Sequence, residues 1–305
     1  MISFRQHVVT IVAVFLALAL GMLAGSAFIQ PRLVDQLRSQ VREQRRTMDD
    51  LRSQVTELGD RYADEQSFND AALDHLTRGR LPERDVVVIA QSGTEDAVVS
   101  RARQALEAAG ATVVVLSARD TLSPQDEEAQ ATLSELLASP DVDPEDLPGR
   151  AAEALADRLV SGGPADPEDP DLLRELLTQG YLAPVDAGLS DATVASIGGP
   201  GEVVVVLSGG QTEDPVMAPE DFAVPLVRRL AELGIPVAAG EAVDTLLPFV
   251  TVLRASGIDG IVTVDDLDQS RGGAALVLGL EQLVTTGEGG DYGVKDGAVP
   301  LPPPP

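Results

Sequence analysis

Five short stretches of the chain consist almost entirely of small and aliphatic residues, many of them β-branched. They lie at residues 86–90, 112–116, 203–207, 236–240 and 260–264. Strands without polar alternation are typical of a parallel sheet that is buried on both faces. Stretches with helical periodicity separate most of them, at residues 95–109, 219–233 and 244–256. The alternation predicts an α/β fold with a Rossmann-like or flavodoxin-like parallel sheet.

Residues 8–29 contain no charged side chain. As a helix this stretch would be about 33 Å long, close to the roughly 30 Å of a bilayer's hydrocarbon core. A signal peptide is the alternative, because residues 24–27 are small, but the stretch exceeds the roughly 7–15 apolar residues typical of one. We therefore expect a retained transmembrane helix in the lipid bilayer. Gly21 and Gly25 form a G-x-x-x-G pair, which favours close packing of two such helices.

A heptad repeat follows the apolar stretch without a break. Its first nine a and d positions are apolar except for Gln44. The apolar seam residues are Val34, Leu37, Val41, Met48, Leu51, Val55, Leu58 and Tyr62. With Gly21 and Gly25 they predict a coiled-coil stalk and a parallel homodimer or higher homo-oligomer. A stalk that packs back on its own domain is the alternative.

These patterns divide the chain into four parts. They are a transmembrane anchor (1–30), a coiled-coil stalk (31–80), an acidic α/β domain (81–287) and a Gly/Pro-rich tail (288–305). The domain carries an acidic insert at about residues 120–200, with helical patterns at 126–138, 149–160 and 172–179. The closing proline run predicts that the last residues are disordered.

The net charge of −27 arises entirely after residue 80, since the first 80 residues hold ten arginines and ten acids. A field of that sign repels phosphate backbones and argues against nucleic-acid binding. The chain has no cysteine, which excludes disulfides, thiolate ligands and thiol nucleophiles.

A weak internal repeat connects two of the expected strands. VVVIAQSGTED begins at Val86 and VVVVLSGGQTED begins at Val203. Each Ser-Gly turn follows a strand, and open α/β sheets bind ligands at the carboxyl ends of their strands. The turns predict a ligand-binding crevice formed by Ser92, Gly93, Thr94, Ser208, Gly209, Gly210 and Gln211. Ordinary turns between strand and helix are the alternative.

The sequence contains no catalytic constellation, so we do not expect an enzyme. His7 and His75 both precede the α/β domain, which therefore cannot hold a Ser-His-Asp triad. No dinucleotide-binding glycine pattern follows the first strand, and no cofactor is indicated. LSGGQ at residues 207–211 matches the signature of ABC-transporter ATPases, but Lys295, the only lysine, lies in no phosphate-binding loop. We interpret that match as chance.

The residues leave the metal-binding capacity of the chain unknown. Copper favours thiolate, thioether and imidazole ligands, and the four methionines are far apart from one another in the sequence. Asp265 and Asp266 could bind a hard cation. In so acidic a chain, however, we expect both at the surface.

The opening sequence MISFRQHVVTIVAVFLALALGMLAGS resembles that of the mycobacterial copper-transport protein B (MctB) family. The Ser-Gly turns and the closing TVDDLDQSRGGAALVLGLEQL, followed by DYGV at residues 291–294, are similar to the same family. The resemblance implies a cell-envelope protein, described as an outer-membrane copper-transport or pore protein. It further implies a role in copper efflux or homeostasis, copper ions as the transported species, and an α/β domain outside the cytoplasm.

Two features of the sequence do not follow from that resemblance. Arginines are more frequent after the apolar helix than before it, which by the positive-inside rule places the stalk in the cytoplasm. The expected strands are continuously apolar, whereas strands of outer-membrane barrels alternate. We follow the resemblance on orientation and leave the pore as its implication. A non-enzymatic coiled-coil scaffold that presents the α/β domain to envelope partners is the alternative function.

Overall fold

The computed structural model describes residues 4–123, 127–164, 169–185, 189–212 and 215–303. Side chains are described in the same ranges except at residues 26–35, 74 and 127, so the expected seam residue Val34 lies outside the described side chains. The chain divides into two compact units, Met1–Glu65 and Gln66–Pro305. The division falls within the first helix.

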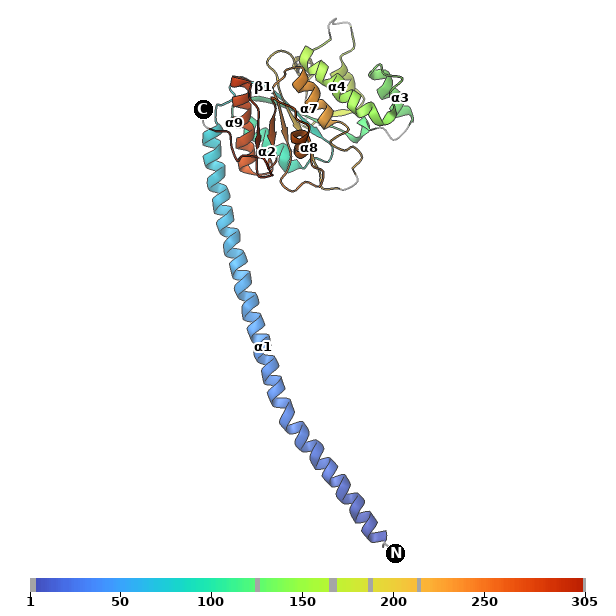
Figure 1. Cartoon of the computed structure of the whole chain (residues 1–305), viewed down its shortest axis with the longest axis vertical. Helices are drawn as coiled ribbons and strands as arrows, with labels where there is room; N and C mark the ends of the chain where they lie inside the picture. The colour runs from blue at the N-terminus through green and yellow to red at the C-terminus, as the bar shows by residue number, and fades with distance from the viewer. Residues whose placement is uncertain (1–3, 124–126, 165–168, 186–188, 213–214, 304–305) are drawn as a thin grey trace. The chain divides into compact units, whose positions relative to one another are not determined.

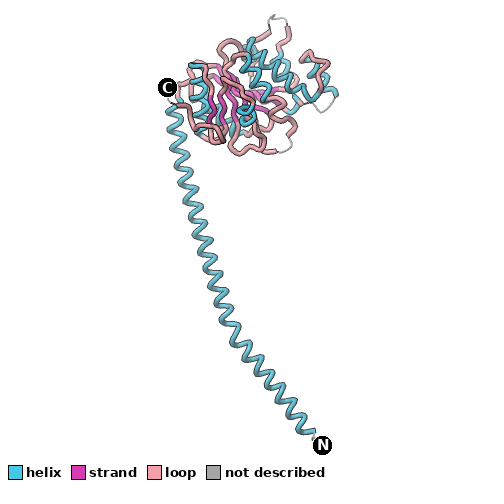
Figure 2. Tube along the Cα trace, viewed as in Figure 1, coloured by secondary structure: helices cyan, strands magenta, loops and turns pink. Residues whose placement is uncertain are grey.

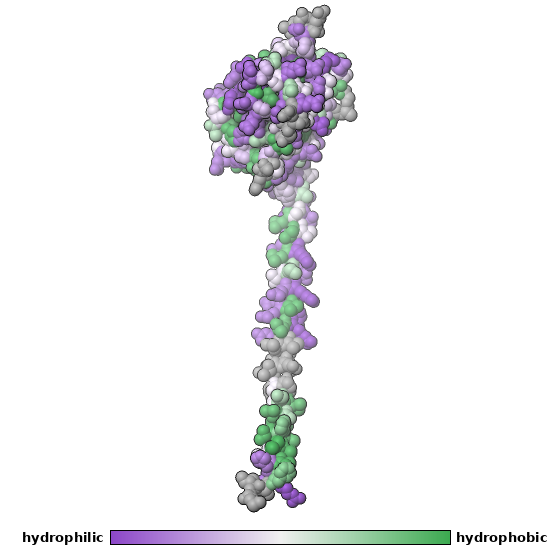
Figure 3. All heavy atoms as spheres, turned by 90° about the vertical axis from the view of Figure 1, so that its right-hand side faces the viewer, coloured by the Kyte–Doolittle hydropathy of each residue, from purple (hydrophilic) through white to green (hydrophobic). Residues whose placement is uncertain are grey.

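Helix α1 spans Phe4–Thr77 and contains both the apolar stretch and the heptad repeat. By length and composition, its segment Phe4–Gly25 could cross a membrane, and none of that segment is buried inside the protein. Figure 3 shows hydrophobic side chains gathered on the turns nearest the N-terminus. The structure therefore contains the helix that the sequence predicts as an anchor.

The described part of the second unit contains a seven-stranded sheet with the order β3-β2-β1-β4-β5-β6-β7 (Figures 1 and 2). All neighbouring strands are parallel except β2 and β3. The five expected strands and the α/β fold class are confirmed, whereas β3 and β7 are additions. The strands are β1 (Asp85–Gln91), β2 (Thr112–Ala118), β3 (Leu182–Pro184), β4 (Val203–Leu207), β5 (Val237–Gly240), β6 (Val262–Val264) and β7 (Gly290–Tyr292).

Helices cover both faces of the sheet. Val87 and Ile89 of β1 enter one core and Val86 and Val88 enter the other, which explains why the strand is apolar throughout. Helices α2 and α9 contribute to the second core, while α4, α7 and α8 contribute to the first. The helices after α1 are α2 (Asp96–Ala108), α3 (Glu127–Leu136), α4 (Leu147–Ser161), α5 (Leu172–Thr178), α6 (Asp191–Ser196), α7 (Ala223–Glu232), α8 (Val250–Ala255) and α9 (Ser270–Thr286).

The acidic insert between β2 and β4 joins the edge of the sheet through β3. Its helices α4 and α5 are connected by a buried ion pair, in which Arg158 Nε lies 2.5 Å from Asp171 Oδ1 and Nη2 lies 2.9 Å from Oδ2. The hydrogen bonds from Arg158 lower the pKa of Asp171. Arg158 also donates to the carbonyl oxygen of Ile197. The insert therefore has a charged element of its own within an otherwise aliphatic core.

Two segments differ from the expectation. The helix expected at residues 244–256 is reduced to α8, since Pro248 disfavours helix at the residue before it and lacks an N–H. The segment expected as a tail begins with strand β7, and Gly293 N donates to Val299 O at 2.9 Å. No local pattern predicts β7, because three residues are too few for a recognisable strand pattern.

Candidate functional site

The two Ser-Gly turns lie side by side at the carboxyl edge of the sheet. Ser92 follows β1 and Ser208 follows β4, and these two strands are neighbours. The chain runs from β1 outward to β2 and later returns to β4 on the other side of β1. This reversal is the switch point at which open α/β sheets bind ligands. The structure thus places the turns at the position where a flavodoxin-like sheet has its crevice.

The glycines of the turns allow the two backbones to approach closely. Gly93 has φ +86° and Gly209 has φ +116°, a region that favours glycine. A Cβ atom on Gly210 would lie 3.3 Å from the carbonyl oxygen of Gly93. Thr94 Oγ1 donates to the carbonyl oxygens of Gln91 and Leu207, at 2.7 and 3.3 Å. The expected crevice residues are therefore brought together.

Gln91, which the sequence analysis did not single out, connects the two turns. Its Nε2 donates to the carbonyl oxygens of Met217 and Ala218, at 2.8 and 3.0 Å. Its Oε1 accepts from Ser208 Oγ at 3.3 Å and from Ala223 N at 3.2 Å. A polar residue at the end of an otherwise apolar strand was the available signal. The buried amide holds β1, β4 and the start of α7 together.

Acidic groups lie at the rim of the two turns. Ser92 Oγ donates to Asp120, and Gln211 Nε2 donates to Glu95 at 2.6 Å and to the carbonyl oxygen of Asp244. Carboxylates at this rim disfavour phosphate-bearing ligands, which agrees with the missing nucleotide motif. Ligand binding by the seven residues remains a prediction.

A second polar cluster lies further along the same edge of the sheet, after β5 and β6. Glu241, Asp265 and Asp266 are completely buried. The expectation that Asp265 and Asp266 lie at the surface is therefore wrong. Asp265 and Asp266 come directly after β6, an interior strand of the sheet. A carboxylate at such a position can be buried when a cation from another segment pairs with it.

Glu241 joins the only lysine of the chain to the start of a helix. Its Oε1 lies 2.7 Å from Lys295 Nζ. Its Oε2 accepts from Phe249 N at 2.6 Å and from Val250 N at 3.0 Å, at the first turn of α8. Both oxygens of this buried carboxylate are thus satisfied, as burial of a charge requires.

Asp265 holds the segment after β7 by side-chain and backbone contacts. Its Oδ2 lies 2.6 Å from Arg254 Nη1, and its Oδ1 accepts from Val294 N at 2.7 Å. Lys295 N donates to both oxygens at 3.2 Å. A Cβ atom on Gly293, which has φ +128°, would lie 2.2 Å from Oδ1, so this close approach requires glycine. The second motif, DYGVK, thus supplies backbone N–H donors to the buried carboxylate of the first motif, TVDD.

Asp266 is the least satisfied group of the cluster. Its Oδ2 accepts from Arg271 Nε at 2.5 Å, whereas its buried Oδ1 has no hydrogen-bond partner. Burial raises the pKa of Asp266, and the half-exposed Arg271 only partly offsets this effect. A carboxyl group in such a position favours its neutral form more than an exposed aspartate does.

The second turn and the second cluster lie close to each other. A Cβ atom on Gly209 would lie 2.9 Å from Thr245 Oγ1 and 3.6 Å from Glu241 Cβ. Thr245 Oγ1 in turn accepts from Gly210 N at 2.9 Å. One layer of polar groups therefore extends along the carboxyl edge from β1 to β7.

Metal ligands do not gather at this edge. In the parts of the chain that the structure describes, no group of three or more His, Asp or Glu side chains could hold a metal ion. Met217 is buried, and its carbonyl oxygen accepts from Gln91.

The described side chains of the residues expected to mediate self-association are exposed. Among the described side chains, the apolar seam residues are between 45% (Val41) and 69% (Val55) exposed. Nothing lies within 4 Å of a Cβ built on Gly21 or Gly25. The exposed apolar seam residues are Leu37, Val41, Met48, Leu51, Val55, Leu58 and Tyr62.

One long helix, apolar near its N-terminal end and heptad-bearing further on, and a mostly parallel sheet covered by helices define an α/β protein with a candidate membrane-spanning helix. The family model described as "Copper transport outer membrane protein, MctB" matches residues 1–303, so the chain belongs to this family. The resemblance inferred from the opening and closing sequences is thereby confirmed. This family is a family of copper transporters and not of enzymes.

Mycobacterial relatives match over nearly their whole length. The chain is 28% identical to the Copper transporter MctB of Mycobacterium tuberculosis over 323 residues, which cover 98% of both chains. It is 29% identical to the Copper transporter MctB of Mycobacterium leprae over 330 residues, which cover 99% of both chains. The match includes the anchor, the stalk and the α/β domain alike.

Proposed function

We propose that the protein acts in copper efflux or copper homeostasis as a single-pass protein of the cell-envelope membrane. The observation that carries this proposal is the match to the copper-transport family over residues 1–303. The segment Phe4–Gly25 supports membrane anchoring, because it is apolar and none of it is buried inside the protein. Copper ions are the transported species in this proposal.

The α/β domain lies outside the cytoplasm in this proposal. Two single-cysteine variants test the orientation, since the natural chain has no cysteine. Thr178 is exposed on the domain, and Gln6 precedes the uncharged stretch. An impermeant maleimide should label Thr178→Cys in intact cells and Gln6→Cys only after lysis. The reverse pattern would place the domain in the cytoplasm.

The active form in this proposal is a parallel homodimer or a higher homo-oligomer. The exposed seam of the stalk supports self-association, because an uncovered a/d stripe is stable in water only against another helix. Arg38, Arg45 and Arg52 occupy successive e positions, where an antiparallel pair would bring arginines together. Parallel pairing instead places them near uncharged g positions.

An oligomeric pore is the finer form of the same proposal. Thr10 is the one polar side chain between Val8 and Gly25, and its hydroxyl donates to the carbonyl oxygen of Gln6. Helices of this composition would line a bore with apolar groups. Conductance of the full chain in planar bilayers, with the seam variant Leu51→Asp as control, tests this form directly.

A scaffold without transport activity is the second candidate. The observation that favours it is the polar edge of the sheet, where hydrogen bonds and ion pairs between residues of the domain satisfy nearly every buried group. Such a domain could serve as a rigid module for envelope partners. In this reading cellular copper does not depend on the protein.

Cellular copper in a deletion strain grown with added copper separates the two candidates. The strain is complemented with the full chain, with a chain lacking residues 8–29, or with Leu51→Asp. Copper that rises on deletion and falls only with the anchored chain supports the transport proposal. A failure of Leu51→Asp to restore low copper additionally supports the oligomer. Copper unchanged by deletion would leave the scaffold as the better account.

A further inference from the structure

The last turns of α1 belong to the α/β unit and contact it through one face of the helix. Asp70 accepts a hydrogen bond from Ser270 at the start of α9 and pairs with Arg101 of α2 at 3.6 Å. Leu73 is partly buried and Thr77 is buried on the same face. Residues 70, 73 and 77 therefore fix the end of the helix against α2 and α9.

The heptad seam occupies a different face of these turns. Its continuation after Tyr62 reaches positions 69, 72 and 76, each one residue before a position that contacts the domain. One residue corresponds to about 100° of rotation around an α-helix. The repeat weakens here, with Glu65 and Asn69 in the seam. Ala72 is partly buried, whereas Leu76 is 49% exposed. At this end of α1 the domain and a second helix can be contacted at the same time.

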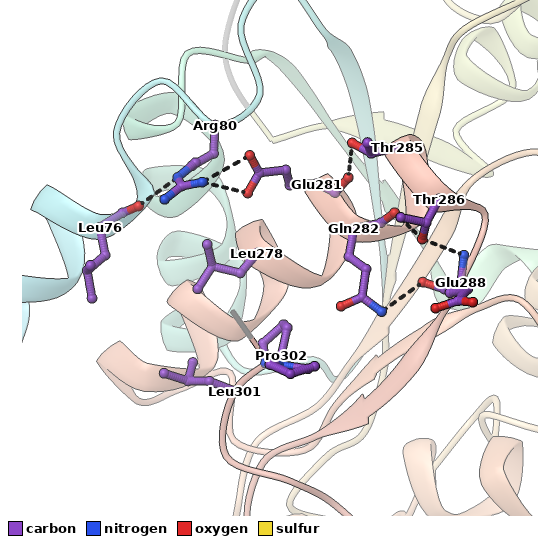
Figure 4. Close-up of a pocket in the computed structure, with 11 residues that line it drawn as sticks. Leu76, Arg80, Leu278, Glu281, Gln282, Thr285, Thr286, Glu288, Leu301 and Pro302 are labelled. Carbon is purple, nitrogen blue, oxygen red and sulfur yellow. Dashed lines mark hydrogen bonds and ion pairs between the residues drawn. The ribbon is translucent and has the colours of Figure 1, made fainter. Parts of the chain in front are cut away.

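A groove of about 480 Å³ begins beside Leu76 (Figure 4). The outer face of α9 forms its floor, and the chain near the C-terminus forms one side. Arg80 Nη1 donates to both carboxylate oxygens of Glu281, at 3.2 and 3.3 Å, on its rim. The residues of the groove used below are Leu76, Arg80, Leu278, Glu281, Leu301 and Pro302.

These residues form a self-complementary surface. A twofold interface places a surface patch against the same patch of a second copy, so that apolar groups must meet apolar groups and each charge its opposite. Leu76, Leu278 and Leu301 supply the apolar part. Arg80 and Glu281 supply one charge of each sign, so that the arginine of each copy can face the glutamate of the other.

We propose that this groove is a contact between two copies of the chain, formed where the stalk seam reaches the α/β domain. The partner is a second copy because Leu76 lies at a seam position of the stalk heptads. A parallel coiled coil brings equal seam positions of the two helices together. The inference rests on the homodimer proposed above and extends its interface from the stalk to α9 and the C-terminal segment.

Disulfide trapping in the full chain, purified in detergent, tests the contact. The chain contains no cysteine, so each variant carries a single thiol. Leu51→Cys reports on the middle of the stalk and Leu76→Cys on the groove. Ala71→Cys is the matched control, since it is exposed and faces away from both the seam and the domain. Equal seam positions of two parallel helices face each other, so their thiols can approach to the roughly 4 Å between Cβ atoms that a disulfide needs.

Trapping of Leu51→Cys and Leu76→Cys, but not of Ala71→Cys, is the expected result. Trapping of Leu51→Cys alone would overturn the groove contact and leave the stalk dimer intact. If neither seam variant is trapped, the homodimer itself fails, and the groove contact fails with it. The two proposals are therefore distinguishable in one experiment.

A second set of variants separates the groove from the helix seam. Leu278→Asp places a charge on the groove floor and is expected to lower trapping of Leu76→Cys at least about fivefold, while trapping of Leu51→Cys persists. Thr178→Asp, on a distant exposed surface, is the control. Arg80→Glu should lower trapping in the same way, and the double variant Arg80→Glu/Glu281→Arg should restore it. Trapping unchanged by Leu278→Asp and Arg80→Glu would overturn the proposal.

Discussion

Aliphatic side chains have opposite environments in the two units of the molecule. Val205 in β4 is completely buried, whereas Leu58, in the stalk part of α1, is 64% exposed. In the sheet, helices on both faces cover each strand. In the stalk, a single helix leaves the described part of its apolar stripe exposed. The α/β domain thus completes its core within one chain, whereas the stalk does not bury its apolar stripe.

Charged side chains differ between the two units in the same way. Arg61 and Glu57 form an exposed pair on the stalk, of a kind that contributes about 0.3–0.5 kcal/mol. Glu241 and Asp265 are completely buried in the domain and depend on Lys295 and Arg254. We therefore expect domain variants to change the free energy of unfolding, and stalk variants to change self-association.

The largest effect on the domain is expected for Asp265→Ala. The change leaves Arg254 without its 2.6 Å partner and leaves the N–H groups of Val294 and Lys295 without an acceptor. Removing one partner of a buried ion pair costs about 3–5 kcal/mol. Urea unfolding followed by tyrosine fluorescence measures the loss, since Tyr181 and Tyr292 are buried in the domain. A loss below about 1 kcal/mol would contradict the assigned role.

Leu51→Asp is expected to abolish self-association without changing the unfolding of the domain. Two carboxylates would face each other in the seam, which should raise the dissociation constant at least about 100-fold, or about 2.7 kcal/mol. Sedimentation velocity of the full chain in detergent measures the change. Ser53→Asp, at an f position on the opposite side of the helix, should leave association unchanged. If the natural chain is already monomeric, the stalk does not mediate self-association.

Lys295→Met is expected to destabilise the domain by about 2–3 kcal/mol. The substitution preserves much of the side-chain length but leaves Glu241 Oε1 buried without a donor. Lys295→Arg retains the charge and should recover most of the loss. The same urea titration provides the measurement. Equal stability of the methionine and arginine variants would show that the ion pair contributes nothing measurable.

The smallest effect is expected for Asp266→Asn, and its sign depends on pH. Burial raises the pKa of Asp266, so the folded state binds its proton more tightly than the unfolded state. This contribution to stability is fully present below the ordinary value of 3.8 and is lost as pH rises through the raised pKa. The amide introduced by Asp266→Asn does not ionise, so the variant avoids the cost of a buried charge above the raised pKa. The variant should therefore be about 1 kcal/mol more stable than the natural chain at pH 7.

Asp171→Asn is the matched control for that pH dependence. Hydrogen bonds from Arg158 lower the pKa of Asp171, so its contribution is present above the ordinary value and is lost as pH falls through the lowered one. For each variant, the unfolding free energy is compared with that of the natural chain between about pH 3 and pH 8. The difference between variant and natural chain should change with pH in opposite directions for Asp266→Asn and Asp171→Asn. Parallel pH profiles would contradict the difference between the two carboxylates.

Much of the fold could be predicted from local patterns. Continuous apolar strands between helical stretches predicted the parallel sheet, because strands buried on both faces have no polar alternation. The Ser-Gly turns could be placed at the carboxyl edge, because each directly follows a strand. Strands β3 and β7 could not be predicted, since each has three residues and forms only against a neighbour that is distant in sequence.

The apolar helix, the heptad stripe and the order of strands and helices along the chain follow from local patterns, because each depends on residues close together in the chain. Which charges are buried depends instead on how distant segments pack together. Asp265 and Asp266 resemble surface residues until β5, β6 and β7 align and bring Arg254, Glu241 and Lys295 to the same edge. Burial of a charge depends on partners that supply opposite charge and hydrogen bonds, and in this domain most of those partners are distant in the sequence.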